Sequence, residues 1–192
     1  MSSRVPISHH YDIYRYWDQQ RRGRTMPARR DISPSDVRHL LPYITLIDHV
    51  DGEFRYRLVG TAVSQELGRD LTGSLVGSYV TPPEYAAAIL GIYEELVAAA
   101  TPIFTTGEYR AASQAIHTVS RLILPLSNDG TTVNMALFTR IARFSRNLTA
   151  GVDWLKGAPG KVCDVITVRS LEHLQTLCAD WERQSLAENT AA

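Results

Sequence analysis

The 192-residue sequence is poor in cysteine, has no net charge and contains no long apolar run. Its two cysteines exclude a disulfide scaffold, and the absence of a run of ~18 apolar residues argues against a membrane-spanning helix. Lysine plus arginine and aspartate plus glutamate each number 20, which argues against general nucleic-acid binding. The apolar share of 44% is typical of soluble globular proteins. We therefore expect a cytoplasmic protein that contacts no membrane.

The sequence also lacks the spacings that bind metals or activate nucleophiles. Cys163 and Cys178 match neither a CxxC nor a zinc pattern, so we expect two free thiols that serve as small core residues. None of the six histidines belongs to an HExxH motif, and the chain has no P-loop and no GxSxG. A metal site is therefore not expected.

Charge is unevenly distributed along the chain. Residues 1–30 contain seven arginines and two aspartates, a net charge of +5, and the remainder carries −5. Such a segment could bind an acidic partner or phosphates. A solvated, arginine-rich helix face is the interpretation that we favour.

Two segments near the ends of the chain predict helices with apolar faces. The spacing over residues 9–22 predicts an amphipathic helix with an aromatic face, and a last helix is expected after Ser170. Each face must be buried against the chain's own domain or against a second subunit. The residues of the expected dimer or partner face are Tyr11, Tyr14, Trp17, Leu174 and Trp181. On this basis we expect a homodimer.

The central part of the chain predicts an antiparallel sheet around a helical insert. Apolar and polar residues alternate clearly over 53–60, and Asp51-Gly52 predicts a hairpin turn before them. Strands are expected over residues 43–50, 53–60, 103–110, 115–127 and 131–144, with a helix over 81–100. Sequential hairpins, together with pairing of the first strand to the last, give an α+β fold. Its five-stranded sheet has the order 2-1-5-4-3, with helices on one face.

The same pattern divides the chain into three parts. Residues 1–42 form an N-terminal helical extension, residues 43–144 the sheet domain, and residues 145–192 a tail with a terminal helix. Within the tail, residues 162–168 could form either a strand or an extended arm.

Several short motifs follow one another in a fixed order. They are Trp17, Arg22-Gly23-Arg24, a P-x-R-x-D-I-x-P stretch over 27–34, YRLVGT over 56–61, LGRDLTG over 67–73, and Leu124-Pro125-Leu126. With the order of strands and helices, these motifs resemble a family of stand-alone bacterial PAS-domain proteins. The resemblance covers about residues 12–144 and depends on the joint order and spacing of the motifs.

The resemblance implies a sensory or regulatory module with no attached enzyme, which binds a small molecule, a signalling-protein partner or both. A PAS pocket lies between the sheet and its covering helices. Mapped by strand alternation, its lining would be Tyr56, Leu58, Tyr93, Phe104, Leu122, Leu124, Met135 and Leu137, although all of these could be packed core.

No particular cofactor is indicated by the resemblance. A photoactive flavin is not expected, because both cysteines lie in the tail. Haem is not expected either, because residues 82–100 contain no histidine. An unknown small organic ligand, or no ligand, remains.

Two alternatives stay open. One is a dimeric scaffold without a ligand, and the other, less favoured, is a small acid–base enzyme that uses Asp48 and His49 with His117 nearby. Five arginines on predicted strands could also recognise a carboxylate or phosphate, which is where a nucleotide-binding hypothesis would rest. They are Arg55, Arg57, Arg121, Arg140 and Arg143. Ordinary pairing with acids such as Glu108 is the interpretation that we favour.

Overall fold

The centre of the fold is a six-stranded antiparallel sheet in the order β2-β1-β5-β4-β3-β6. The computed structural model describes residues 5–78, 83–110, 116–143 and 160–191. The strands are β1 (Ile44–Val50), β2 (Glu53–Val59), β3 (Ile103–Arg110), β4 (Ile116–Ser127), β5 (Val133–Arg143) and β6 (Lys161–Thr167). The α+β class and the predicted order of five strands are confirmed, and a sixth strand extends the sheet beyond β3.

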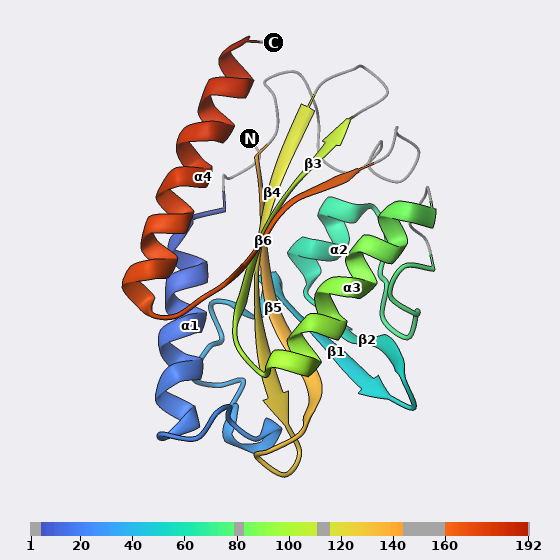
Figure 1. Cartoon of the computed structure of the whole chain (residues 1–192), viewed down its shortest axis with the longest axis vertical. Helices are drawn as coiled ribbons and strands as arrows, with labels where there is room; N and C mark the ends of the chain where they lie inside the picture. Colours follow the sequence, from blue (N-terminus) through green and yellow to red (C-terminus); the bar gives the residue numbers. More distant parts are fainter. Residues whose placement is uncertain (1–4, 79–82, 111–115, 144–159, 192) are drawn as a thin grey trace.

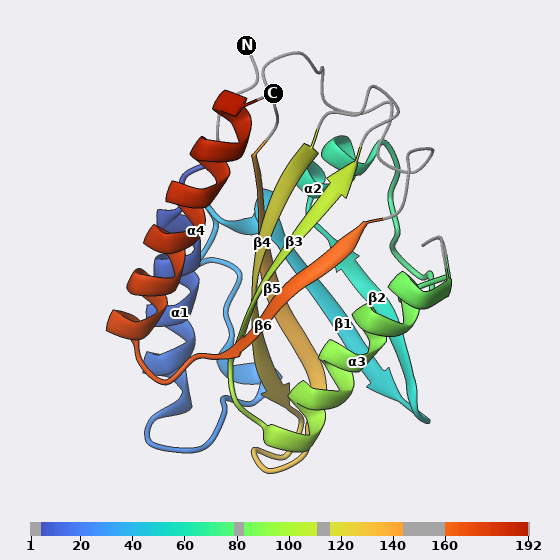
Figure 2. The same ribbon diagram turned by 45° about the horizontal axis from the view of Figure 1, so that its top comes forward.

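Helices lie on both faces of this sheet, not on one (Figures 1 and 2). The helices are α1 (Ser8–Arg21), α2 (Thr61–Leu67), α3 (Pro83–Ala99) and α4 (Leu171–Ala191), with short 3-10 turns at Arg29–Asp31 and Leu41–Tyr43. The inserted helices α2 and α3 cover one face, as predicted. The terminal helices α1 and α4 lie side by side on the opposite face.

The central strands owe their composition to this three-layer arrangement. Along β5 every residue except Asn134 is buried, so both faces of the strand lack solvent. A strand that is covered on both sides reads as a nearly continuous apolar run instead of a clean alternation. The hairpin between β1 and β2 is regular, because Asp51 and Gly52 both adopt positive φ angles, of 52° and 79°.

The aromatic face of α1 is buried within the chain itself. Tyr14 and Trp17 are 6% and 2% exposed, and Leu174 and Trp181 of α4 are 0% and 3% exposed. Tyr11 is half-buried and packs against the same core. The apolar faces of the two terminal helices are therefore buried against the chain's own sheet and not against a second subunit. The expected dimer face is not available on the surface, and a homodimer would have to form elsewhere.

Strand β6 pairs with β3 and carries the chain to α4. Gly107 on β3 lies where the register of this pairing shifts. A Cβ atom at Gly107 would lie 2.8 Å from the carbonyl oxygen of Lys161, so only glycine permits this approach. Cys178 is buried on α4, as expected, but Cys163 is exposed on β6 because the strand forms the sheet edge. The expectation of a core role is therefore wrong for Cys163.

Candidate functional site

Strand alternation divides the buried side chains of the sheet into two sets. One set lies on the α1/α4 face, where His10 of α1 contacts Ser120 and Thr139. The other lies on the α2/α3 face, where Glu66 of α2 forms an ion pair with Arg140. Because side chains alternate along a strand, Thr139 and Arg140 belong to opposite faces although they are neighbours.

The residues predicted to line one pocket are distributed over both faces. Tyr56 of β2 and Tyr93 of α3 belong to the α2/α3 face, where Tyr93 also meets Phe54 with ring centroids 5.5 Å apart. The strand register places five of the predicted lining residues on the α1/α4 face: Phe104, Leu122, Leu124, Met135 and Leu137. Leu58 is 40% exposed. These residues cannot line one pocket, because the apolar side of β4 and β5 is covered by the terminal helices.

The α2/α3 face carries a buried polar row instead. Arg121 on β4 is the direct cross-strand partner of Arg140 on β5, and Thr105 on β3 is the partner of Arg121 on its other side. Arg121, Arg140 and Thr105 are 9%, 5% and 0% exposed. Three polar side chains therefore stand in one line across the sheet, beneath the inserted helices. We call them the arginine row.

Two threonine hydroxyls on this face have no hydrogen-bond partner among the described residues. They belong to Thr105 and to Thr45 of β1, and both residues are fully buried. Thr45 pairs with Phe138, which places it diagonally from Arg140. Buried hydroxyl groups in proteins normally form hydrogen bonds, so these two are candidates for contacts with a bound group.

His117 lies on the same face, farther along β4. It is 4% exposed, and burial lowers the pKa of its imidazole, so the neutral form is favoured. The predicted separation of His117 and Arg121 from Leu122 and Leu124 agrees with the strand register.

The α1/α4 face is joined to the terminal helices by polar contacts as well as by apolar packing. His10 Nδ1 lies 2.7 Å from Thr139 Oγ1, and its Nε2 lies 3.1 Å from Ser120 Oγ. Burial, followed by the charge of Arg143 and then by His9, lowers the pKa of His10 to about 3. His10 is therefore neutral at ordinary pH, one ring nitrogen donating a hydrogen bond and the other accepting one.

Helix α4 is held to the same face by a buried arginine. Arg143 Nη2 donates a hydrogen bond to Glu182 at 2.8 Å, and its guanidinium lies 5.2 Å from the ring centroid of Trp181. Thr118 Oγ1 donates to Ser185 Oγ at 2.7 Å. Both helices therefore meet the sheet through specific polar contacts whose geometry can respond to small shifts of β4 and β5.

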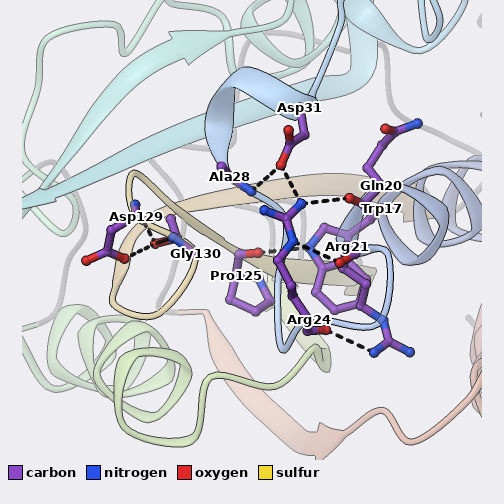
Figure 3. Close-up of polar contacts among 10 residues, drawn as sticks. Trp17, Gln20, Arg21, Arg24, Ala28, Asp31, Pro125, Asp129 and Gly130 are labelled. Atoms are coloured by element: carbon purple, nitrogen blue, oxygen red, sulfur yellow. Dashed lines mark hydrogen bonds and ion pairs between the residues drawn. The ribbon is translucent and has the colours of Figure 1, made fainter.

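Four of the six motifs that carry the family resemblance meet where α1 ends: Trp17, Arg22-Gly23-Arg24, the stretch over 27–34, and Leu124-Pro125-Leu126 (Figure 3). Trp17 Nε1 donates a hydrogen bond to the carbonyl oxygen of Pro125 at 2.8 Å. Arg24 donates to Asp31 at 2.6 Å and to the carbonyl oxygens of Arg21 and Gln20. These motif residues therefore anchor α1 to the end of β4, a structural role that their spacing alone did not indicate.

Three of the seven arginines of residues 1–30 form ion pairs with nearby aspartates. Asp12, Asp18 and Asp31 accept ion pairs from Arg15, Arg21 and Arg24. This agrees with the favoured interpretation of a solvated helix face.

The alternative acid–base pair is not assembled. Asp48 and His49 are consecutive on β1, so they point to opposite faces. Asp48 accepts an ion pair from Arg57 at 3.1 Å, and His49 stacks on Phe54 at 4.5 Å. His117 lies about ten residues, roughly 33 Å, farther along the sheet, so the three groups do not converge.

The remaining strand arginines are separated from the arginine row. Arg55 and Arg57 are exposed and pair with Glu53 and Asp48. Arg143 lies on the α1/α4 face. Glu108, the acid named as an ordinary partner, pairs with Thr118 and so belongs to the face opposite Arg121. Of the five arginines, the structure therefore brings two together.

Metal-binding clusters and membrane-spanning helices are both absent from the described ranges. Within them, no cluster of three or more histidine, cysteine, aspartate or glutamate side chains could hold a metal ion. No helix in those ranges has the length and hydropathy required to span a membrane.

Comparison with known proteins identifies one related family. A family model for the PAS domain matches residues 6–138, from just before α1 into β5. No curated protein matches the chain. The matched range contains α1, the inserted helices and the arginine at position 121, and it ends shortly before Arg140.

Proposed function

The chain belongs to the PAS domain family, and we propose that it binds a small molecule on its α2/α3 face and reports the binding through its terminal helices. PAS domains are generally sensory or regulatory modules and generally not enzymes. The observation that carries the proposal is the buried polar row on the α2/α3 face, with two hydroxyl groups that lack partners among the described residues. A fully packed scaffold has no reason to bury such groups.

The mechanism that we propose is a shift between two packings of α1 and α4. Along strands β4 and β5, residues that would face the ligand alternate with residues that face α1 and α4. A shift of these strands on ligand binding would therefore change their contacts with the terminal helices. A ligand shifts this equilibrium only by its differential affinity for the two packings, and a tenfold difference is worth about 1.4 kcal/mol. In bacterial signalling, a partner protein would read the change at α1 and α4.

The test is native mass spectrometry of the purified full chain, repeated under denaturing conditions. We expect an extra mass that is lost on denaturation. Hydrogen exchange before and after removal of the ligand should then show changed protection in α1 and α4. A preparation without bound mass, whose helix protection also fails to respond to any compound of a metabolite library, would contradict the proposal and favour a scaffold.

A homodimer is a second proposal, favoured by the edge position of β6. This strand has β3 as its neighbour on one side and is mostly exposed along its length. An edge strand can pair with a second copy through its backbone. The native spectrum reports the subunit count directly, and a monomer at all concentrations would contradict this part.

A further inference from the structure

The arginine row places two like charges opposite each other inside the protein. Arg121 and Arg140 are direct partners on neighbouring strands and are both buried beneath α2 and α3. Side chains at such positions have Cβ atoms roughly 5 Å apart, and like charges there repel. Buried charges also lose their hydration, which is tolerated only where anionic or polar groups replace water. A carboxylate that contacts both guanidinium groups would reduce this repulsion.

The structure itself shows which anion suits this place. Glu66 reaches from α2 and forms an ion pair with Arg140, and their side chains are 14% and 4% exposed. Helix α2 spans Thr61–Leu67, and Val63 is its buried residue. A carboxylate on a short helix with little apolar burial thus already contacts the arginine row. A guanidinium group matches a planar carboxylate through two parallel hydrogen bonds.

A buried hydroxyl beside Arg121 could bind an oxygen atom of a carboxylate. Thr105 is next to Arg121 in the row, and its buried hydroxyl has no partner in the part of the chain that the structure describes. The neighbouring row on the same face consists of Gly107, Val119 and Ala142, whose side chains are small or absent. A buried hydroxyl without a partner costs free energy, which a bound oxygen atom would recover.

We propose that Arg121, Arg140 and Thr105 bind the carboxylate group of a small organic acid, and that Glu66 competes with this ligand for Arg140. This inference rests on the proposed ligand-binding function and names the chemical class of the ligand. The two guanidinium groups hold the carboxylate oxygens, and the Thr105 hydroxyl donates a hydrogen bond to one of them. Displacement of Glu66 loosens α2, which links binding to a change in the fold.

The experiment measures binding to the full chain by calorimetry and by thermal shift at constant ionic strength. The probes are a panel of small aliphatic, aromatic and α-keto carboxylic acids, each beside its uncharged amide, with inorganic phosphate as a further anion. We expect at least one acid to bind and its amide to bind at least ~10-fold more weakly, as the loss of a charge-assisted hydrogen bond implies. Arg121→Gln should weaken binding of that acid by at least ~10-fold. Glu66→Gln should strengthen it, because the internal competitor loses its charge.

Arg143→Gln is the matched control for loss of a buried arginine. Arg143 is 5% exposed on the same sheet but faces α4, where it pairs with Glu182. This variant should lose stability and weaken binding of the acid much less than Arg121→Gln does.

Thr105→Val keeps the proposal testable even where an arginine variant does not fold. Valine has the shape of threonine without its hydroxyl, so this variant should raise the melting temperature of the ligand-free protein and weaken acid binding. A merely structural role of Thr105 would leave the affinity unchanged.

Other outcomes overturn the inference. They are equal binding of acid and amide, unchanged affinity in both Arg121→Gln and Thr105→Val, binding of phosphate alone, and absence of binding by every acid. In each of these cases the proposed function is tested separately. Native mass spectrometry shows whether a small molecule co-purifies, and hydrogen exchange shows whether the protection of α1 and α4 responds to it. A neutral ligand found there would leave the sensory function standing and remove the carboxylate assignment.

Discussion

Thr139 and Arg140 are consecutive residues of β5 that serve opposite faces of the sheet. Thr139 contacts His10 of α1 at 2.7 Å, and Arg140 forms an ion pair with Glu66 of α2. The same alternation recurs on β4, where Ser120 contacts His10 and Arg121 belongs to the arginine row. One buried histidine on one face thus lies behind the paired arginines of the other. A movement of these two strands must therefore alter contacts on both faces.

Thr139→Val tests how strongly this contact holds α1. The variant removes the hydroxyl that pairs with His10 and leaves a fully buried imidazole nitrogen without that partner. We expect the free energy of unfolding to fall by about 1–3 kcal/mol and the amide protection of α1 to decrease. Urea denaturation and hydrogen exchange measure the two effects. The control is Thr105→Val, the same substitution on the opposite face, which should stabilise the protein. Equal losses in both variants would show that the His10 contact has no special role.

The buried His10 predicts a specific loss of stability in acid. Its pKa is lowered to about 3 from the ordinary value of 6.5, so the unfolded chain binds a proton that the folded chain rejects. Its contribution to stability is complete above pH 6.5 and is lost as the pH falls toward 3. Between pH 6.5 and pH 4.5 we expect a loss of about 2–3 kcal/mol from this residue.

Urea denaturation across this pH range, with His10→Gln as the comparison, isolates the contribution. The variant should be less stable at pH 7.5 but should lose less stability on acidification than the wild type. The exposed His39, changed to glutamine, is the control for loss of a histidine from the surface. A wild-type profile that stays parallel to that of His10→Gln would contradict the role of His10.

Strand alternation predicted the division of the sheet side chains correctly but not which helices each set meets. On β4 the period of two separates Arg121 and His117 from Leu122 and Leu124, and the register confirms this separation. Both faces of β4 and β5 are buried, however, so the apolar set is not automatically the set beneath the inserted helices. The arginine row was therefore assigned to ordinary pairing. One signal in the sequence could have indicated it. Arg121 and His117 are four residues apart on one strand, so two polar side chains share one face of β4.

The terminal helices show a second limit of the sequence. An aromatic stripe such as that of Tyr14 and Trp17 indicates that a helix is buried but does not indicate by what. The bond from Trp17 to Pro125 joins residues 108 positions apart, and no local pattern predicts it. The two residues were both recognised as motif positions, which indicated importance without indicating contact.

Arg24 is expected to be the main polar anchor of the turn after α1. It donates hydrogen bonds to Asp31 and to two backbone carbonyl oxygens. The hydrogen bond to Asp31, with that from the Ala28 N–H and the charges of Arg24 and Arg22, lowers the pKa of the Asp31 carboxyl group. Arg24→Gln should lower the free energy of unfolding by about 1–2 kcal/mol at neutral pH. Because folding lowers the pKa of Asp31, the part of this stability that comes from the Arg24–Asp31 pair is present above the ordinary pKa of 3.8 and is lost as the pH falls below it.

The control for Arg24 is Arg15→Gln on the exposed side of α1. Arg15 lies 3.8 Å from Asp12, both side chains are exposed, and the change should cost less than about 0.5 kcal/mol. Urea denaturation at neutral pH and at pH 3 compares the two variants. Similar small effects of both substitutions would show that the carbonyl contacts of Arg24 add nothing to the fold.

Gly107 is expected to be the residue that decides whether β6 can join the sheet. A methyl group at this position would meet the carbonyl oxygen of Lys161 at 2.8 Å, and a backbone atom cannot turn aside as a flexible side chain can. Gly107→Ala should therefore separate β6 from β3 at the irregular pair and reduce amide protection in β6 and α4, with a stability loss of about 2–4 kcal/mol. Hydrogen exchange locates the effect, and urea denaturation measures it.

Gly91→Ala in the middle of α3 is the matched control for this last substitution. Apart from its chain neighbours and the backbone of its own helix, no atom lies within 4 Å of the position that its Cβ would take. Alanine also favours the helix over glycine by about 1 kcal/mol. That variant should be slightly more stable than the wild type. Unchanged protection of β6 in Gly107→Ala would mean that the strand can shift its register at little cost. In that case the register of β6 (Lys161–Thr167) would not determine the position of α4. The attachment of α4 to the sheet would then depend on the contacts of Arg143 with Glu182 and with the buried Trp181.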